Sequence, residues 1–144
     1  MKVIGIDPGV KNGLAEYENC VLVSVHTYSV IELIHWLPDY LKIHRCVVVI
    51  EDSRLQSYMF TGNDKNRSTA LKMARNVGMV DMVCSILEEI CKSTGTKLKL
   101  ISPKGKGEKL DSCKFRQVTG SDVKTNQHNR DAAMVAWPYR NYVQ

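Results

Sequence analysis

Acidic and histidine side chains with metal-binding chemistry come from three distant parts of the sequence. Asp7 ends the apolar run KVIGID, and Glu51 directly follows the apolar run CVVVI. Both runs are typical of buried strands, and functional groups of open α/β sheets gather outside the carboxyl ends of the strands. Asp7 and Glu51 therefore meet if these two strands are parallel neighbours. His128 and Asp131 lie three residues apart, a spacing that puts both on one face of a helix.

These four groups predict a site for divalent metal ions. Carboxylates that lie close together in a low-dielectric cleft repel each other, and a divalent ion is the usual compensation. Hard carboxylate oxygens suit Mg²⁺, and the single imidazole extends the tolerance to Mn²⁺. Each residue alone also has a structural interpretation, as a turn residue, a strand end, a helix cap or a core histidine, so the metal site depends on their convergence. Asp52 is expected to face the opposite side from Glu51.

The apolar patterning predicts a single α/β domain over residues 1–144. An antiparallel meander comes first and parallel crossovers follow, which gives a five-stranded mixed sheet. Pro38 is expected to kink or end the first helix, and the small Ala132 and Ala133 would let the last helix approach the sheet closely. The predicted strands are 2–7, 13–17, 20–28, 46–50 and 97–101, and the predicted helices are 30–43, 68–92, 108–119 and 126–137.

The composition favours a globular protein with an anionic partner. Lys and Arg number 20 against 15 Asp and Glu, which gives a net charge of +5 with neutral histidines. No apolar run approaches the roughly eighteen residues of a membrane span, and we expect no secretory signal. The five cysteines show no paired CxxC spacing, which indicates a reduced protein. We therefore expect a cytoplasmic protein with no membrane association and no small-molecule cofactor.

The motifs around these residues resemble those of the RuvC family of Holliday-junction resolvases, in the RNase H-like superfamily. The first family motif is similar to IGIDPGVKNGLA at 4–15, the second to VVVIEDSR at 47–54, and the last to HNRDAA at 128–133. The start of the family's long helix is similar to Asn66, Ser68, Ala70, Leu71, Lys72, Ala74, Arg75 and Gly78. Each motif alone is weak, but their order and spacing together are specific and span nearly the whole chain.

The resemblance implies an RNase H-like fold with helices on both faces of the sheet, and a homodimeric nuclease that makes paired nicks across a four-way DNA junction. It implies two Mg²⁺ ions per active site, replaceable by Mn²⁺. Asp7 would bridge both ions, and Glu51, His128 and Asp131 would complete the coordination. Such ions activate a water and stabilise the leaving 3′ oxygen, so the products are 5′-phosphate and 3′-hydroxyl ends. The small size fits a phage or prophage member, acting in the cytoplasm of a bacterial cell or an infected host.

A basic segment after the last strand is the predicted DNA contact. It carries lysines interleaved with Gly105 and Gly107, and phosphate contacts need both flexible cations and close backbone approach. The resemblance places catalytic or phosphate-contacting lysines here. Our candidates are Lys104, Lys106 and Lys109, with Lys104 also a candidate catalytic group. The alternative is a solvated turn after an exposed strand.

The loop after Glu51 departs from the family pattern. Typical bacterial members have an aromatic residue where this chain has Arg54, and the loop is longer here. Tyr58 and Phe60 follow within it, and they either stack on unpaired bases at the junction centre or pack on their own domain. We include Arg54 and Arg75 among the candidate DNA contacts.

Two apolar stripes on the predicted helix 68–92 indicate burial on two sides. The second stripe is the candidate dimer interface, since a four-way junction has approximate two-fold symmetry and needs two related active sites. The alternative is that another helix of the same chain covers it. The first stripe is Ala70, Ala74, Val77, Val80, Cys84, Leu87 and Cys91, and the second is Met79, Met82 and Ile86.

Two other functions fit parts of the pattern. One is a nuclease of the YqgF type, which acts on structured RNA, although Glu51 directly after the apolar strand favours the RuvC pattern. The other is a non-catalytic module that binds branched DNA. A pure binding protein has no reason to retain a set of mutually repelling acids, which favours the nuclease.

Overall fold

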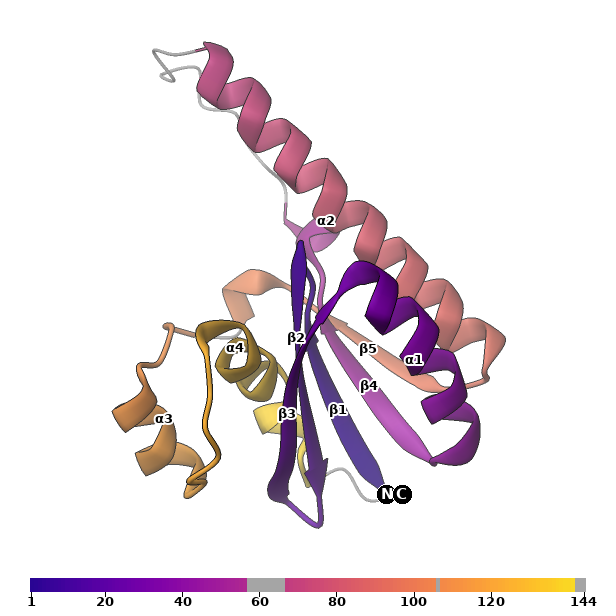
Figure 1. Cartoon of the computed structure of the whole chain (residues 1–144), viewed down its shortest axis with the longest axis vertical. Helices are drawn as coiled ribbons and strands as arrows, with labels where there is room; N and C mark the ends of the chain where they lie inside the picture. Colours follow the sequence, from indigo (N-terminus) through magenta and orange to yellow (C-terminus); the bar gives the residue numbers. More distant parts are fainter. Residues whose placement is uncertain (57–66, 106, 142–144) are drawn as a thin grey trace.

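A computed structural model describes residues 1–56, 67–105 and 107–141 as a five-stranded sheet with helices on both faces (Figure 1). The strands are Lys2–Asp7 (β1), Lys11–Glu18 (β2), Val21–Ser29 (β3), Cys46–Glu51 (β4) and Lys97–Ile101 (β5). Their order is β3-β2-β1-β4-β5, with β1 at the centre. The pairs β1–β2 and β2–β3 are antiparallel, whereas β1–β4 and β4–β5 are parallel. The predicted antiparallel meander and parallel crossovers are therefore confirmed.

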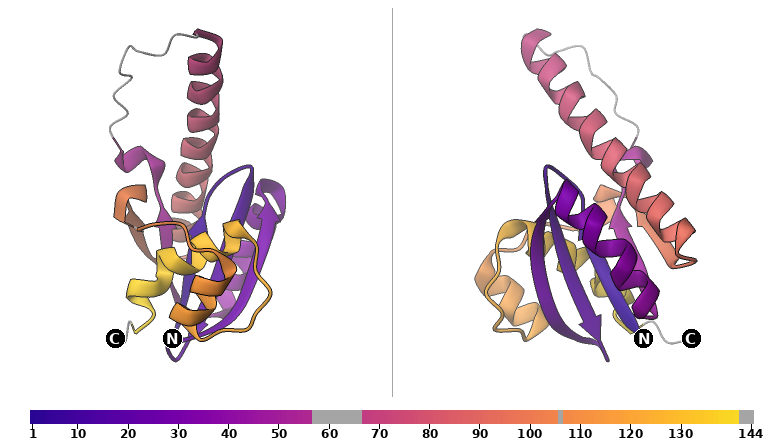
Figure 2. Two further views of the ribbon diagram at one scale, coloured as in Figure 1. Left: turned by 90° about the vertical axis from the view of Figure 1, so that its left-hand side faces the viewer. Right: turned by 45° about the vertical axis from the view of Figure 1, so that its right-hand side comes forward.

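Helices cover the two faces of this sheet in pairs (Figure 2). On one face lie α1 (Val30–Ile43) and α2 (Arg67–Ser93), and on the other lie α3 (Ser112–Thr119) and α4 (Gln127–Ala136). The predicted helix at 108–119 begins only at Ser112, because the Asp111 side chain accepts the Lys114 amide and caps the helix there. Short 3₁₀ helices occupy Ser53–Leu55, Pro103–Gly105 and Trp137–Tyr139.

Helix α1 does not end at Pro38, contrary to one of the two outcomes predicted for it, but continues to Ile43. Its start is fixed by a capping box, in which Ser29 and Glu32 each accept a backbone amide of the other. The face of the helix that carries Leu33 and Leu37 is buried against the sheet. The apolar face is buried both before and after the proline. The free energy gained by this burial offsets the loss of the backbone hydrogen bond that proline cannot make.

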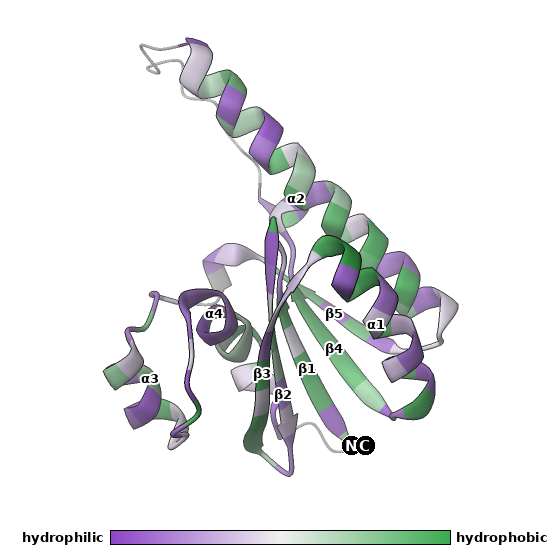
Figure 3. Ribbon diagram, in the orientation of Figure 1, coloured by the Kyte–Doolittle hydropathy of each residue, from purple (hydrophilic) through white to green (hydrophobic). Residues whose placement is uncertain are grey.

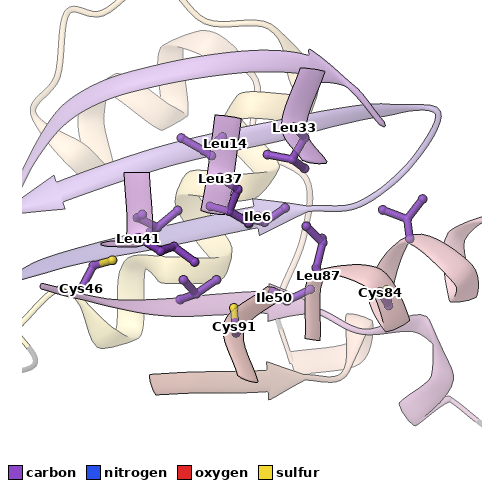
Figure 4. Close-up of a cluster of buried hydrophobic side chains, with 13 residues drawn as sticks. Ile6, Leu14, Leu33, Leu37, Leu41, Cys46, Ile50, Cys84, Leu87 and Cys91 are labelled. Atoms are coloured by element: carbon purple, nitrogen blue, oxygen red, sulfur yellow. The ribbon is translucent and has the colours of Figure 1, made fainter. Parts of the chain in front are cut away.

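Two apolar cores lie on the two faces of the sheet, and β4 contributes to both. Val48 and Ile50 pack beneath α1 and α2, while Val47 and Val49 pack on the side of α4. The colouring by hydropathy shows the corresponding apolar run along β4 (Figure 3). The continuous apolar run therefore marks a strand covered on both faces, as predicted. Ten residues of the first core are labelled in Figure 4: Ile6, Leu14, Leu33, Leu37, Leu41, Cys46, Ile50, Cys84, Leu87 and Cys91.

Only the second half of α2 packs on the sheet, and its first half projects beyond the body of the protein (Figure 1). Of the first predicted stripe, Cys84, Leu87 and Cys91 are buried, whereas Ala74 is exposed because no described element covers that part of the helix. No helix in the described part of the chain is long and apolar enough to cross a membrane.

Candidate active site

The acidic and histidine side chains singled out in the sequence surround one hollow of about 360 Å³ at the carboxyl ends of β1 and β4. Three separate chain segments supply them, as the sequence analysis predicts. The lining residues are Asp7, Pro8, Gly9, Val10, Lys11, Glu51, Lys109, Gln127, His128 and Asp131.

The parallel pairing of β1 and β4 places two of the carboxylates. Ile6 pairs with Ile50, so Asp7 and Glu51 are the next residues on neighbouring strands that run in the same direction. The side chain of Asp7 is only 16% exposed, and the Oε2 atom of Glu51 is buried. Both acids therefore lie in a partly desolvated position, where the charge of each raises the free energy of the other.

The start of α4 delivers the other two groups. Asn126 caps the helix through a reciprocal capping box with Asn129, and its side-chain amide also donates to Thr27 Oγ1 at 2.9 Å. This capped first turn points His128 toward β1, with Nδ1 3.9 Å from Asp7 Oδ2. Asp131, one turn later, is buried beside the hollow.

Two glycines on the sheet let α4 come this close. Gly13 pairs with Asp7 across the β1–β2 ladder, and a Cβ at Gly13 would lie 1.9 Å from the His128 carbonyl oxygen. A Cβ at Gly5 would lie 2.1 Å from the Ala132 carbonyl oxygen. The backbone of the helix thus lies almost directly on the strands. The small residues of the helix were predicted to allow this approach, but these glycines were not, although a glycine inside a strand pattern signals such an approach.

A tyrosine of β2 forms a hydrogen bond to the backbone of α4. Tyr17 is fully buried, and its hydroxyl donates to the Ala133 carbonyl oxygen at 3.1 Å. Burial raises the pKa of the Tyr17 phenol, so the group keeps the proton that makes this hydrogen bond.

The loop that follows Asp7 is fixed by Asn12, whose role was not predicted from the sequence. Asn12 is fully buried, and its side-chain oxygen accepts the Gly9 amide at 3.1 Å. Its side-chain nitrogen donates to the Tyr28 carbonyl oxygen at 3.3 Å. A buried polar side chain with both ends satisfied holds the loop between the strands in one shape.

The basic segment contributes Lys109 to the hollow. Its ammonium lies 3.9 Å from Asp131 Oδ2. Of the other two candidate lysines, Lys104 is exposed on the 3₁₀ helix Pro103–Gly105, and Lys106 lies outside the described residues. The structure therefore places Lys109, rather than the candidate catalytic Lys104, beside the acids.

The carboxylate next to Glu51 belongs to a different network. Asp52 is buried and accepts hydrogen bonds from the guanidinium of Arg54, which also bonds Glu88 at 2.8 Å and Ser85 at 3.0 Å. Although burial opposes it, these hydrogen bonds hold the pKa of Asp52 below its ordinary value. The guanidinium of Arg54, a candidate DNA contact, is thus committed to acids of its own chain.

The remaining candidate DNA contacts are spread over the chain. Arg75 is exposed on the projecting half of α2. Tyr58 and Phe60 lie outside the described residues, so their stacking role stays a prediction.

Within the described residues, no three His, Cys, Asp or Glu side chains lie close enough together to form a ready-made metal site. The donor set itself fits a hard divalent ion, since three carboxylates and one imidazole face the same hollow. Ion binding would require these side chains to come closer together than they lie here.

Larger hollows, of about 520 and 480 Å³, lie at the opposite end of the sheet, around His44 and Arg45. Their described linings combine basic and apolar side chains with a single acid, Glu18. The smaller hollow is the better candidate, because it gathers opposed carboxylates, an imidazole and a lysine at the carboxyl ends of parallel strands.

Comparison with known proteins places the fold. No family model matches the chain, and no curated protein sequence matches it. Its structure is similar to that of RuvC from Thermus thermophilus in complex with a Holliday junction substrate, with a TM-score of 0.66 and 17% identity over 99% of this chain and 94% of that one. A second structure of T. thermophilus RuvC gives a TM-score of 0.60 and 16% identity over 99% and 95% of the two chains. The protein therefore has an RNase H-like fold of the RuvC kind, as the motifs predict.

The contact between α4 and the sheet gives a first testable prediction. Changing Gly13 to Ala should lower the free energy of unfolding by about 3 kcal/mol, because the new methyl group meets backbone atoms of His128 that cannot move independently of the helix. Urea denaturation followed by circular dichroism measures this change.

The matched control is Gly78→Ala, the same substitution on α2, where nothing lies within 4 Å of the added Cβ. It should raise the free energy of unfolding by about 1 kcal/mol, since alanine is the better helix former. Equal effects of the two substitutions would contradict the close approach at Gly13.

Proposed function

We propose that this protein is a structure-selective endonuclease that resolves four-way DNA junctions by metal-dependent hydrolysis, leaving 5′-phosphate and 3′-hydroxyl ends. The observation that carries the proposal is the meeting of Asp7, Glu51 and Asp131 with His128 in one hollow of a RuvC-like fold. The similar T. thermophilus RuvC is a protein seen in complex with a Holliday junction substrate, which supports branched DNA as the substrate class.

The acids of the hollow would hold two Mg²⁺ ions, or Mn²⁺ in their place. Asp7 is the central ligand of this proposal, because it lies between Glu51 on the neighbouring strand and His128 on the helix. When bound, such ions polarise the scissile phosphate, activate a water and stabilise the leaving oxygen. Asp131 completes the set from the buried side of α4.

Cations at the rim of the hollow would bind the phosphates of the DNA. Lys109 and Lys11 both line it and are exposed, so their ammonium groups can reach a bound backbone. Lys104 and Arg75 are further proposed phosphate contacts, and Lys106, which lies outside the described residues, stays a candidate from the sequence. Arg54 instead neutralises acids within the fold. Because each neutralised phosphate releases counterions, junction affinity would fall steeply as salt rises.

The exposed methionines of α2 would form a homodimer interface. Met79 and Met82 are 49% and 61% exposed, and Ile86 is half-buried. With Val10 and Ile31 they form an apolar surface around a hollow of about 380 Å³, lined by Gly9, Val10, Ser29, Val30, Ile31, Met79, Met82 and Val83. An exposed apolar patch of this kind is typical of an interaction site, and a second copy would supply the second active site that paired nicking requires.

Asp7→Asn tests the catalytic assignment. The substitution removes the central charge but keeps the shape, so cleavage of a fixed four-way junction with Mn²⁺ should fall by more than roughly 100-fold, since even outer-shell partners of a metal are worth about 10–100-fold. Junction binding, measured by gel mobility shift without metal, should survive.

The control is Asp122→Asn, the same change at a carboxylate that is 87% exposed and pairs only with Arg116 among the described residues. It should leave cleavage unchanged. Full cleavage by Asp7→Asn would remove Asp7 from the mechanism. A structured RNA is assayed beside the junction, and preferential cutting of the RNA would identify a YqgF-like activity instead.

Met82→Glu tests the interface. A charge within the apolar surface should convert a dimer into a monomer, as measured by analytical ultracentrifugation, and the monomer should keep a native circular dichroism spectrum, because the side chain is exposed. Paired nicks in a junction should then become single, uncoupled nicks.

Met73→Glu is the control on the same helix. Met73 is 55% exposed, but it lies nine residues from Met82 and therefore on the opposite side of the helix. It should leave the dimer intact. A wild-type protein that sediments as a monomer at micromolar concentration would contradict the proposed interface.

A further inference from the structure

We propose that Gln127 and Arg130 are positioning residues that hold the Asp131 carboxylate and the backbone beside Lys109 in one fixed arrangement. The inference rests on the proposed metal-dependent function, and it assigns the outer contacts that orient one of the acids. Neither residue is a metal ligand in this proposal, since a guanidinium has no lone pair to offer and the Gln127 oxygen is turned toward Arg130.

Gln127 forms a hydrogen bond to the Asp131 carboxylate within the same helix. Its side-chain nitrogen donates to Asp131 Oδ1 at 2.8 Å, one turn along α4. Asp131 is buried, so this hydrogen bond forms in a medium where it is stronger than in water. It occupies Oδ1, while Oδ2 is the oxygen nearer to the Lys109 ammonium at 3.9 Å.

Arg130 fixes which end of the Gln127 amide faces the acid. Its Nη2 donates to Gln127 Oε1 at 3.1 Å. A guanidinium can only donate, so the amide oxygen must face Arg130 and the amide nitrogen must face Asp131. Without Arg130, the Gln127 side-chain amide can rotate by half a turn. Its oxygen would then face the Asp131 carboxylate, and the two groups would repel each other.

The same guanidinium ties two chain segments to the helix. Its Nε donates to the Leu110 carbonyl oxygen at 3.0 Å, and Nη1 donates to Thr125 Oγ1 at 3.1 Å and to the Thr125 carbonyl oxygen at 3.3 Å. Leu110 directly follows Lys109, a side chain that is 71% exposed. Anchoring the backbone at Leu110 keeps this long, exposed side chain within reach of the acids.

One set of hydrogen bonds therefore serves two parts of the site. The bond from Gln127 orients the Asp131 carboxylate, and the bonds from Arg130 fix the backbone next to the Lys109 ammonium. Outer contacts of this kind change metal affinity by about 10–100-fold when they are removed. The planar, three-nitrogen geometry of arginine is required, since a lysine would keep the charge but make fewer of these bonds.

The variants Gln127→Met and Arg130→Lys separate the effect on the Asp131 carboxylate from the effect on the segment that carries Lys109. Mn²⁺ binding without DNA is measured by titration calorimetry, and junction binding is measured in metal-free buffer. Gln127→Met should weaken Mn²⁺ binding about 10-fold and leave junction binding unchanged. Arg130→Lys should weaken both. The double variant should bind Mn²⁺ no more weakly than the weaker single variant, because the two residues act in series.

The control is Gln117→Met, the same substitution at an exposed position of α3 whose side chain contacts Cys113. It should change neither measurement. Thermal unfolding of every variant separates an effect on the site from an effect on the fold. If Gln127→Met does not fold, the Mn²⁺ affinity of Arg130→Lys tests the inference.

Mn²⁺ affinities of Gln127→Met and Arg130→Lys equal to that of the wild type would overturn this inference and leave the nuclease proposal standing. Additive losses in the double variant would also overturn it. A wild-type protein that binds no Mn²⁺ would overturn both the inference and the metal-dependent function.

Discussion

The site depends on a backbone-to-backbone contact between α4 and the sheet. Gly5 and Gly13 leave no side chain between the strands and the carbonyl groups of Ala132 and His128. A helix normally packs on a sheet with a layer of side chains between them, which would hold the acids of the helix away from the strand ends. At this contact the layer is missing, so a group on the first turn of α4 comes within 3.9 Å of a strand carboxylate.

The two consecutive acids at the end of β4 show how the fold divides charge. Side chains alternate across a strand, so Glu51 faces the hollow while Asp52 faces α2. On the α2 side, Arg54 bonds both Asp52 and Glu88, and these carboxylates are neutralised within the protein. On the hollow side, Glu51 lies with two further carboxylates beside Lys109. Acids gathered in this way favour the arrival of a cation from solution.

Sequence patterns predicted the elements well where burial alone decides them. The first, fourth and fifth strands were predicted from apolar or alternating runs and the other two as a hairpin of apolar and β-branched residues, and the carboxyl-end rule then predicted that Asp7 and Glu51 meet. The start of α3 was not predicted, because a local cap decides it, and the sequence left open whether α1 would kink or end at Pro38, which tertiary packing decides. Periodicity on α2 gave its apolar positions but not where the covering sheet ends.

The residues that orient and support the proposed metal ligands could not be predicted from the sequence, for a different reason. Asn12 and Gln127 are polar residues in polar stretches, and their importance comes from partners that only the fold brings near. The same holds for the choice of lysine, since Lys104 and Lys109 lie in one basic segment, and only the fold places Lys109 beside Asp131, next to the Leu110 carbonyl oxygen that Arg130 bonds. Glycine is the exception, because Gly5 and Gly13 interrupt strand patterns visibly in the sequence.

The proposed active site and the proposed interface share one loop. Gly9 and Val10 line both the acidic hollow and the apolar hollow beside α2, and Asn12 holds the loop in a single shape. A second copy seated on Met79 and Met82 would therefore bury the outer side of the loop that follows Asp7. Since Asp7 directly precedes this loop, a copy seated there would lie next to the proposed active site, so the two proposals meet at Gly9 and Val10.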